Sequence, residues 1–197
     1  VPADWESAVE DKSVQVSLVP FEGPEVRVRD ERLWQEPQSI VIYHDIVDTG
    51  TKYGKIKADR IVRNKSFKLC QGETAVVDFG QNMVGWVLFK AKARSGTVVT
   101  LRHGEMLNEN GDHDGRLEDG PGGSVWTYNL RQADAKVSYT FRGDAKGETY
   151  HPTHTFMGFR YVSITATDDV EIVRLTGQVV GSDIAEWGEF SCSDASI

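Results

Sequence analysis

The stretch FRYVSIT at residues 159–165 decides the fold, because apolar and polar side chains alternate along it. A β-strand places successive side chains on opposite faces, so this alternation predicts a strand with one face in a core. Similar alternation occurs at residues 14–18, 98–103 and 137–141, and residues 40–43 are rich in β-branched side chains. Short strands separated by turn residues are typical of a sandwich or a barrel.

Helical periodicity is nearly absent, and the best helical candidate spans only residues 130–135. The 19 glycines lie mostly between the strand segments, where they suit turns better than helix interiors. We therefore predict an all-β fold, an antiparallel β-sandwich with little helix.

The length of 197 residues fits one domain, or one domain with parts of its neighbours. We expect residues 1–36 to be a leading segment, whose strands could belong to a preceding module. Residues 37–178 are the predicted β-sandwich domain, and residues 179–197 an exit strand and linker. The chain opens at Val1 without a methionine and stops at Ile197 without a turn, so we expect a piece of a longer protein.

The composition excludes several classes of protein. Acidic residues outnumber basic ones 30 to 22, and the basic residues are scattered, which argues against a nucleic-acid partner. No apolar run approaches the ~18 residues of a membrane span.

Two cysteines, Cys70 and Cys192, are too few for a disulfide framework, and we expect separate thiols, although the sequence leaves their pairing open. No signal peptide is visible, so the compartment stays undetermined.

Residues 77–86, VDFGQNMVGW, read as a strand that ends in a turn and restarts. Gly80 and Gly85 permit positive φ or a close backbone approach. The functional alternative is a carbohydrate site with contacts from Asp78, Gln81, Asn82 and Trp86. The structural interpretation is favoured.

Three other segments contain residue types that occur in catalytic or metal sites. His103 and Glu105 should share one strand face, which favours a structural polar network over a base and its orienting carboxylate. Residues 110–121 begin like a calcium loop, but Pro121 stands where the last ligand belongs. His151 and His154 should face opposite sides of an extended segment, which disfavours zinc. We expect no metal and no cofactor.

Aromatic side chains are numerous enough to line a sugar groove, although aromatic-rich strands more often form core. If the domain contacts sugar, we expect Trp126 and Tyr128 to combine with Asp112 and Asp114 of the acidic loop. Trp86 is a weaker candidate. Exposure of Trp34, Trp86 and Trp126 along one face would favour binding, and their burial would favour a scaffold.

Six short motifs together resemble bacterial α-L-rhamnosidases of glycoside hydrolase family 78, and they occur in the family's order over nearly the whole chain. They are DFGQN with GW at 78–86, HGE at 103–105, TYNLR at 127–131, ETYHP at 148–152, GFRY at 158–161 and GEFSCS at 188–193. Ser138, Met157 and a longer turn after residue 111 depart from the family pattern.

The resemblance implies a sandwich of the jelly-roll or concanavalin-like type that precedes an (α/α)₆ barrel. In the family, carboxylates of the barrel catalyse hydrolysis of terminal rhamnose with inversion, which requires a general acid and a general base on either side of the glycosidic bond, far enough apart to admit a water. The resemblance therefore implies no catalytic residue in this chain and a partner in its own catalytic barrel. The structural residues we expect are Asp78, Gly80, Gly85, Glu105, Gly158 and Arg160.

Two functions remain open from the sequence. The first is a non-catalytic accessory sandwich of an α-L-rhamnosidase. The second is an independent carbohydrate-binding module for rhamnose-containing glycans. A self-contained hydrolase would need Glu105 to converge with Asp78 or Glu148.

Overall fold

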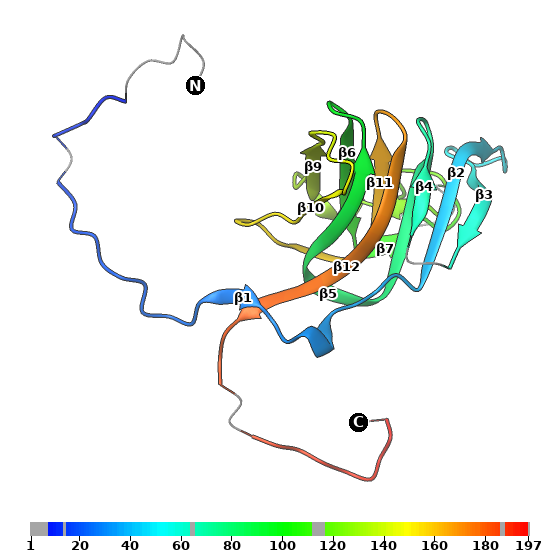
Figure 1. Cartoon of the computed structure of the whole chain (residues 1–197). Helices are drawn as coiled ribbons and strands as arrows, with labels where there is room; N and C mark the ends of the chain where they lie inside the picture. Colours follow the sequence, from blue (N-terminus) through cyan, green and yellow to red (C-terminus); the bar gives the residue numbers. More distant parts are fainter. Residues whose placement is uncertain (1–7, 14, 64–65, 112–116, 186–187, 197) are drawn as a thin grey trace.

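The computed structural model is an all-β structure built on one curled antiparallel sheet of ten strands, with a separate two-stranded ribbon (Figure 1). It describes residues 8–13, 15–63, 66–111, 117–185 and 188–196. None of the helices in these ranges is long and apolar enough to cross a membrane. The predicted all-β sandwich with little helix is confirmed.

The elements follow in chain order. They are β1 (Val26–Val28), η1 (Glu31–Leu33), β2 (Ser39–Val47), β3 (Lys55–Val62), β4 (Phe67–Leu69), β5 (Thr74–Ala93), β6 (Val98–Gly104), β7 (Met106–Leu107), β8 (Val125–Trp126), η2 (Tyr128–Leu130), β9 (Lys136–Thr140), β10 (Glu148–Tyr150), β11 (Met157–Ala166) and β12 (Val170–Ser182). Both η elements are single turns of 3₁₀-helix.

Strand β5 organises the sheet because its two halves have different neighbours. Residues 74–78 pair with β2 on one side and with β11 on the other. Residues 83–93 pair with β11, β10 and β12. The curled sheet encloses a single core, in which Ile40 of β2 and Leu175 of β12 belong to the same buried cluster. One long strand therefore joins the two halves of the sandwich.

Aromatic side chains fill the centre of this core. Phe79 and Phe159 are fully buried and meet edge to face, with ring centroids 5.7 Å apart. Phe89 makes a similar edge-to-face contact with Tyr139 and a tilted one with Phe141. Edge-to-face pairs add to the stabilisation that burial of the rings already gives.

β5 bends in the segment where the sequence predicted a turn, and that prediction is wrong because the strand does not end there. Phe159 pairs with Met83 and Tyr161 with Asp78, so residues 79–82 lie opposite Arg160 alone. Gly80 supplies the positive φ of +78° that this bend uses. The surplus residues form a bulge, and a bulge bends the strand without breaking it.

The matching irregularity in β11 breaks the alternation predicted for residues 159–165. Phe159 and Val162 are both fully buried, and Arg160 and Tyr161 lie between them, half-buried. In a regular strand one residue separates two buried side chains, but here two residues separate Phe159 from Val162. The extra residue is the mark of a bulge.

The chain segments on either side of the sandwich meet at one edge. β1 pairs with the end of β12, where Val26 lies opposite Ser182 and Val28 opposite Val180. The sheet thus continues across residue 178, the predicted end of the sandwich domain. The division of the chain into three parts remains a prediction.

One local prediction is wrong. Residues 15–18 are exposed and outside any strand, because no described strand pairs with them to satisfy an alternating pattern. The best helical candidate, residues 130–135, forms no helix beyond Leu130 at the end of the single turn η2, and Arg131 and Ala135 take positive φ. Positive φ at a residue with a Cβ cannot continue a right-handed helix.

A buried carboxylate holds the turn between β9 and β10. Glu148 is 3% exposed and accepts hydrogen bonds from the backbone amides of residues 142, 143 and 144. The Tyr139 hydroxyl donates to the same carboxylate at 2.7 Å. These bonds, led by the Arg142 amide, lower the pKa of Glu148 to about 2.

Gly85→Ala is expected to destabilise the domain, because its Cβ would lie 1.9 Å from the Gln178 carbonyl oxygen of the neighbouring strand. Relief requires separation of β5 from β12, and overpacking of this kind costs roughly 1–3 kcal/mol or more. Urea unfolding followed by tryptophan fluorescence measures the loss. Gly72→Ala is the control for a strained glycine with open space around it, and equal losses in both variants would contradict the steric explanation.

Acid is expected to weaken the fold through Glu148. The pKa is about 2 in the folded chain against an ordinary 4.5, so the carboxylate stabilises the fold above pH 4.5 and loses that contribution as the pH falls toward 2. Glu148→Gln should lower the melting temperature at pH 7 by several degrees and flatten its decline between pH 4.5 and 2. An unchanged acid profile in the variant would refute this assignment.

Candidate functional site

The bulge between β5 and β11 is fixed by a two-point ion pair on the outer surface. Arg160 Nε donates to Asp78 Oδ1 at 2.8 Å and Nη2 to Oδ2 at 2.9 Å. The Gly80 amide donates to the same Oδ1 at 2.6 Å. Burial alone would raise the pKa of Asp78, but the bonds from Arg160 and Gly80 outweigh it and hold the pKa below its usual range. Asp78 is therefore a permanent carboxylate that ties β5 to β11.

A second polar cluster lies beside this pair, around Glu105. The Asn82 side-chain amide donates to Glu105 Oε1 at 3.0 Å, and that of Asn129 reaches Oε2 at 3.5 Å. Gly158 of β11 lies next to the same carboxylate. The three polar residues come from the bulge of β5, the end of β6 and η2, so only the fold brings them together. The sequence singled out Asn82 and Glu105 separately and missed Asn129.

Glu105 lines one hollow, and a second hollow lies at the neighbouring Gly158. One, of about 310 Å³, is lined by Glu105, Met106, Leu107, Glu109, Arg160 and Tyr161. The other, of about 350 Å³, includes Leu130, Phe156, Met157 and Gly158 in its wall. Phe156 is 53% exposed there. Polar groups, an aromatic ring and open space therefore meet on the outer face of β11.

The predicted sugar-contact aromatics do not form one exposed face. Trp86 is 7% exposed, donates from Nε1 to Gln178 Oε1 at 2.9 Å, and stacks on His151 at 5.3 Å between ring centroids. Trp34 and Trp126 are half-buried, and each indole N–H donates to a backbone carbonyl. Tyr128 alone is more than half exposed among these candidates. Asp112 and Asp114 lie outside the described residues, so the predicted surface around them stays a prediction.

His103 and Glu105 do not share a face, contrary to the prediction. β6 ends at Gly104, so Glu105 leaves the strand and turns to the surface. His103 is fully buried, and its Nδ1 bonds to the Ala135 carbonyl at 3.0 Å. Burial lowers the pKa of His103 to about 4, which keeps the ring neutral near pH 7.

The described residues contain no group of three or more His, Cys, Asp or Glu side chains that could hold a metal ion. Of the loop at residues 110–121 that begins like a calcium loop, residues 112–116 lie outside the described residues. Glu118 of this loop is buried and accepts from the backbone amides of Glu109 and Asn110. Asp119 accepts from the backbone amide and the hydroxyl of Thr127.

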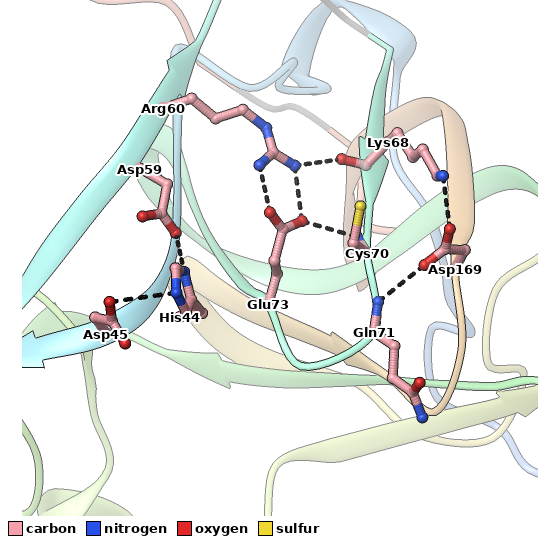
Figure 2. A network of polar contacts seen from close by, with 9 residues as sticks. All are labelled: His44, Asp45, Asp59, Arg60, Lys68, Cys70, Gln71, Glu73 and Asp169. Carbon is pink, nitrogen blue, oxygen red and sulfur yellow. Dashed lines mark hydrogen bonds and ion pairs between the residues drawn. The ribbon is translucent and has the colours of Figure 1, made fainter.

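A larger polar network joins the strands and turns at another edge of the sandwich (Figure 2). Glu73 forms a two-point pair with the Arg60 guanidinium and accepts from the Cys70 amide at 2.7 Å. These bonds, led by that from Arg60, lower the pKa of Glu73 to about 2. Arg60 also donates to the Lys68 carbonyl, so the pair connects β3, β4 and the turn before β5.

Further contacts in Figure 2 extend this network to the turn between β11 and β12. Asp169 pairs with Lys68 at 2.6 Å and accepts from the Gln71 amide at 3.0 Å. On the other side, His44 lies 2.7 Å from Asp59 and 3.2 Å from Asp45, and the bond with Asp59 raises the pKa of His44. Each charged side chain drawn in Figure 2 forms an ion pair or hydrogen bond with another residue of the network, so we call the network a structural clamp.

The two cysteines are separate free thiols, as expected. Cys70 lies half-buried inside the clamp, and Cys192 is exposed near the end of the chain.

The sequence offered two carboxylate pairs for acid and base chemistry, Glu105 with Asp78 and Glu105 with Glu148. A glycosidase needs one carboxylic acid with a raised pKa opposite a carboxylate. Asp78 is held by Arg160, and the Glu148 side chain is buried under backbone amides, so both have lowered pKa values. Neither Asp78 nor Glu148 is therefore the proton donor that a pair with Glu105 would need.

Residues 68–181, from β4 to the end of β12, match the family model described as the bacterial alpha-L-rhamnosidase concanavalin-like domain. The chain belongs to this family. The resemblance inferred from the six motifs is confirmed.

The relatives of this concanavalin-like domain are much longer proteins. An α-L-rhamnosidase of Streptomyces avermitilis is 46% identical over 90 residues, which are 46% of this chain and 8% of that protein. One from Alteromonas sp. is 36% identical over 135 residues, 67% of this chain and 13% of that protein. The chain thus spans about a tenth of the length of these relatives.

Solved structures agree with this assignment. The Streptomyces avermitilis α-L-rhamnosidase complexed with L-rhamnose superposes with a TM-score of 0.51 and 28% identity, covering 82% of this chain and 12% of that one. The α-L-rhamnosidase from Dictyoglumus thermophilum gives a TM-score of 0.54 over 87% of this chain and 15% of that one. At 24% identity the second shows the fold alone.

Arg160→Lys is expected to destabilise this concanavalin-like domain by about 1 kcal/mol, because one ammonium cannot replace the two parallel bonds to Asp78 at a half-buried site. Thermal unfolding measures the change. Arg174→Lys is the matched control, because the Arg174 guanidinium donates to the Thr176 hydroxyl and pairs with no carboxylate among the described residues. A melting temperature unchanged by Arg160→Lys, with loss of sugar binding, would show a ligand role in place of the structural one.

Proposed function

We propose that this chain is a non-catalytic accessory domain of an α-L-rhamnosidase that removes terminal α-L-rhamnose from glycans or glycosides. The proposal rests on the family match over residues 68–181 and on the span of about a tenth of the relatives' length. The catalytic carboxylates then belong to another part of the enzyme, a helical barrel in the same polypeptide. The sandwich packs against that barrel and holds its orientation.

The structural hydrogen bonds of three carboxylates support this role. Asp78, Glu73 and Glu148 each accept bonds that fix a strand or a turn, and all three have lowered pKa values. Their negative charge serves the scaffold and leaves no proton for a glycosidic oxygen at neutral pH. Residues 1–36 and 179–197 would connect the sandwich to its neighbours.

The purified chain is expected to show no hydrolysis of an aryl α-L-rhamnoside above background. The assay follows release of the phenol across pH 4 to 8, with an intact α-L-rhamnosidase as the positive control. Glu105→Gln serves as the diagnostic variant, since Glu105 lies at the outer surface and accepts there from the neutral side-chain amides of Asn82 and Asn129. Turnover by the chain that disappears in this variant would overturn the proposal.

An independent carbohydrate-binding module is the second candidate. The partial burial of Trp34, Trp86 and Trp126 argues against a tryptophan-lined platform. One observation favours sugar contact elsewhere, namely the cluster of Glu105, Asn82 and Asn129 beside two open hollows.

A further inference from the structure

We propose that the outer face of β11 around Gly158 is a binding site for one neutral sugar unit, held by Glu105, Asn82 and Asn129 and bordered by Phe156. This site differs from the predicted sugar surface in the groups that hold the sugar, although Asn129 belongs to the same turn, η2, as Tyr128. It goes beyond the accessory role, because sugar binding here requires no hydrolysis.

Gly158 is the first reason. Its φ lies outside the left-handed region, and a Cβ would meet only Glu105, at 3.5 Å from Oε1, which is an ordinary contact. Gly80 and Gly85 differ, since the first needs positive φ and the second has no room for a Cβ. The backbone therefore does not require glycine at 158. A glycine inside a strand costs stability and often marks a place where a ligand approaches closely.

The polar groups beside Gly158 match the hydroxyls of a sugar. Glu105 is an acceptor between two side-chain amides, and each amide also carries an acceptor oxygen. Neighbouring sugar hydroxyls both donate and accept, so they can bridge such an alternating row. Arg160 adds a donor at the rim, because Asp78 engages Nε and Nη2 and leaves Nη1 without a partner among the described residues.

The apolar groups beside Gly158 match the C–H face of a sugar. Phe156 is 53% exposed and lines the same hollow as Gly158. Val84 lies opposite Gly158 across the strand pair and is 48% exposed. The hollow of about 350 Å³ lies at the lower end of the volumes usual for small-molecule sites, which suits one ring.

Charge selects a neutral ligand. Asp134 and Lys136 line the hollow at Gly158 as a pair of opposite charges 3.7 Å apart, so they add no net charge to it. Glu105 and Glu109 both line the neighbouring hollow, and Arg160 is neutralised by Asp78. A carboxylated or sulfated sugar would be repelled at close range by these glutamates. A neutral deoxy sugar keeps its hydroxyls for Glu105 and directs an apolar carbon toward Phe156.

The test is a titration of the ¹⁵N-labelled full chain with methyl α-L-rhamnopyranoside up to tens of millimolar, followed by NMR. Saturable shifts are expected at the side-chain amides of Asn82 and Asn129 and at the backbone amides of Gly158 and Glu105. Shifts confined to Trp126 and Tyr128, shifts at Trp86, or no shifts at all would each overturn the proposal.

Two variants separate binding from folding. Gly158→Ala should keep the melting temperature within a few degrees but weaken binding, because its methyl group occupies the floor of the site. Glu105→Gln should weaken binding roughly tenfold through the loss of a charge-assisted acceptor. Glu171→Gln, a carboxylate paired with Lys92 at the other end of the sheet, is the matched control and should leave both unchanged. Equal affinity in all three variants would refute the placement.

A uronic acid methyl glycoside completes the series and should bind more weakly than the rhamnoside. Tighter binding of the uronic acid would overturn the charge argument. The result is independent of the accessory role, since that role fails only if the chain itself turns over substrate.

Discussion

The passage of β5 from one half of the sandwich to the other is the constraint on which the rest of the structure depends. A strand that pairs with β2 at one end and with β12 at the other must bend between them, and the bend must keep its backbone groups satisfied. Gly80 supplies the conformation, and the pair of Asp78 with Arg160 fixes the opposing strand against it. If this corner were relaxed, the two halves of the sheet would lose their common register and with it the shared core.

The same corner also determines where the outer surface carries chemistry. The bulge pushes Asn82 outward beside the end of β6, where Glu105 leaves the strand. The opposing bulge in β11 presents Arg160 and Tyr161 to the surface between two buried residues. A structural device for bending a strand thereby assembles amide, carboxylate and guanidinium groups at one place. Bulges are known to redirect side chains in this way.

Carboxylates elsewhere in the sandwich act as scaffold. Glu148 gathers three successive amides of a turn, and Glu73 joins β3 to the turn before β5. The hydrogen-bond donors around each side chain lower its pKa and keep it ionised, so some of the chain's negative charge stabilises turns. Glu73 and Glu148 thus serve the fold, which agrees with the accessory role proposed above.

The sequence by itself determined the strands whose alternation reports a buried face, such as residues 98–103 and 137–141, and its ordered motifs determined the family. Side-chain alternation is a local property, so it can be read without knowing the partners of a strand. The sequence could not show that residues 77–86 continue as one bent strand, because a bulge is defined by the register of the strand opposite. It also could not join Asn129 to Glu105 and Asn82, since these residues are far apart in the chain and meet only when β5, β6 and η2 are packed together. Residues 15–18 show the converse, because their alternation has no effect without a neighbouring strand. The alternation of apolar and polar residues determines which face of a strand is buried. The pairing of strands in the tertiary structure determines where the buried faces meet and which polar groups lie together at the surface.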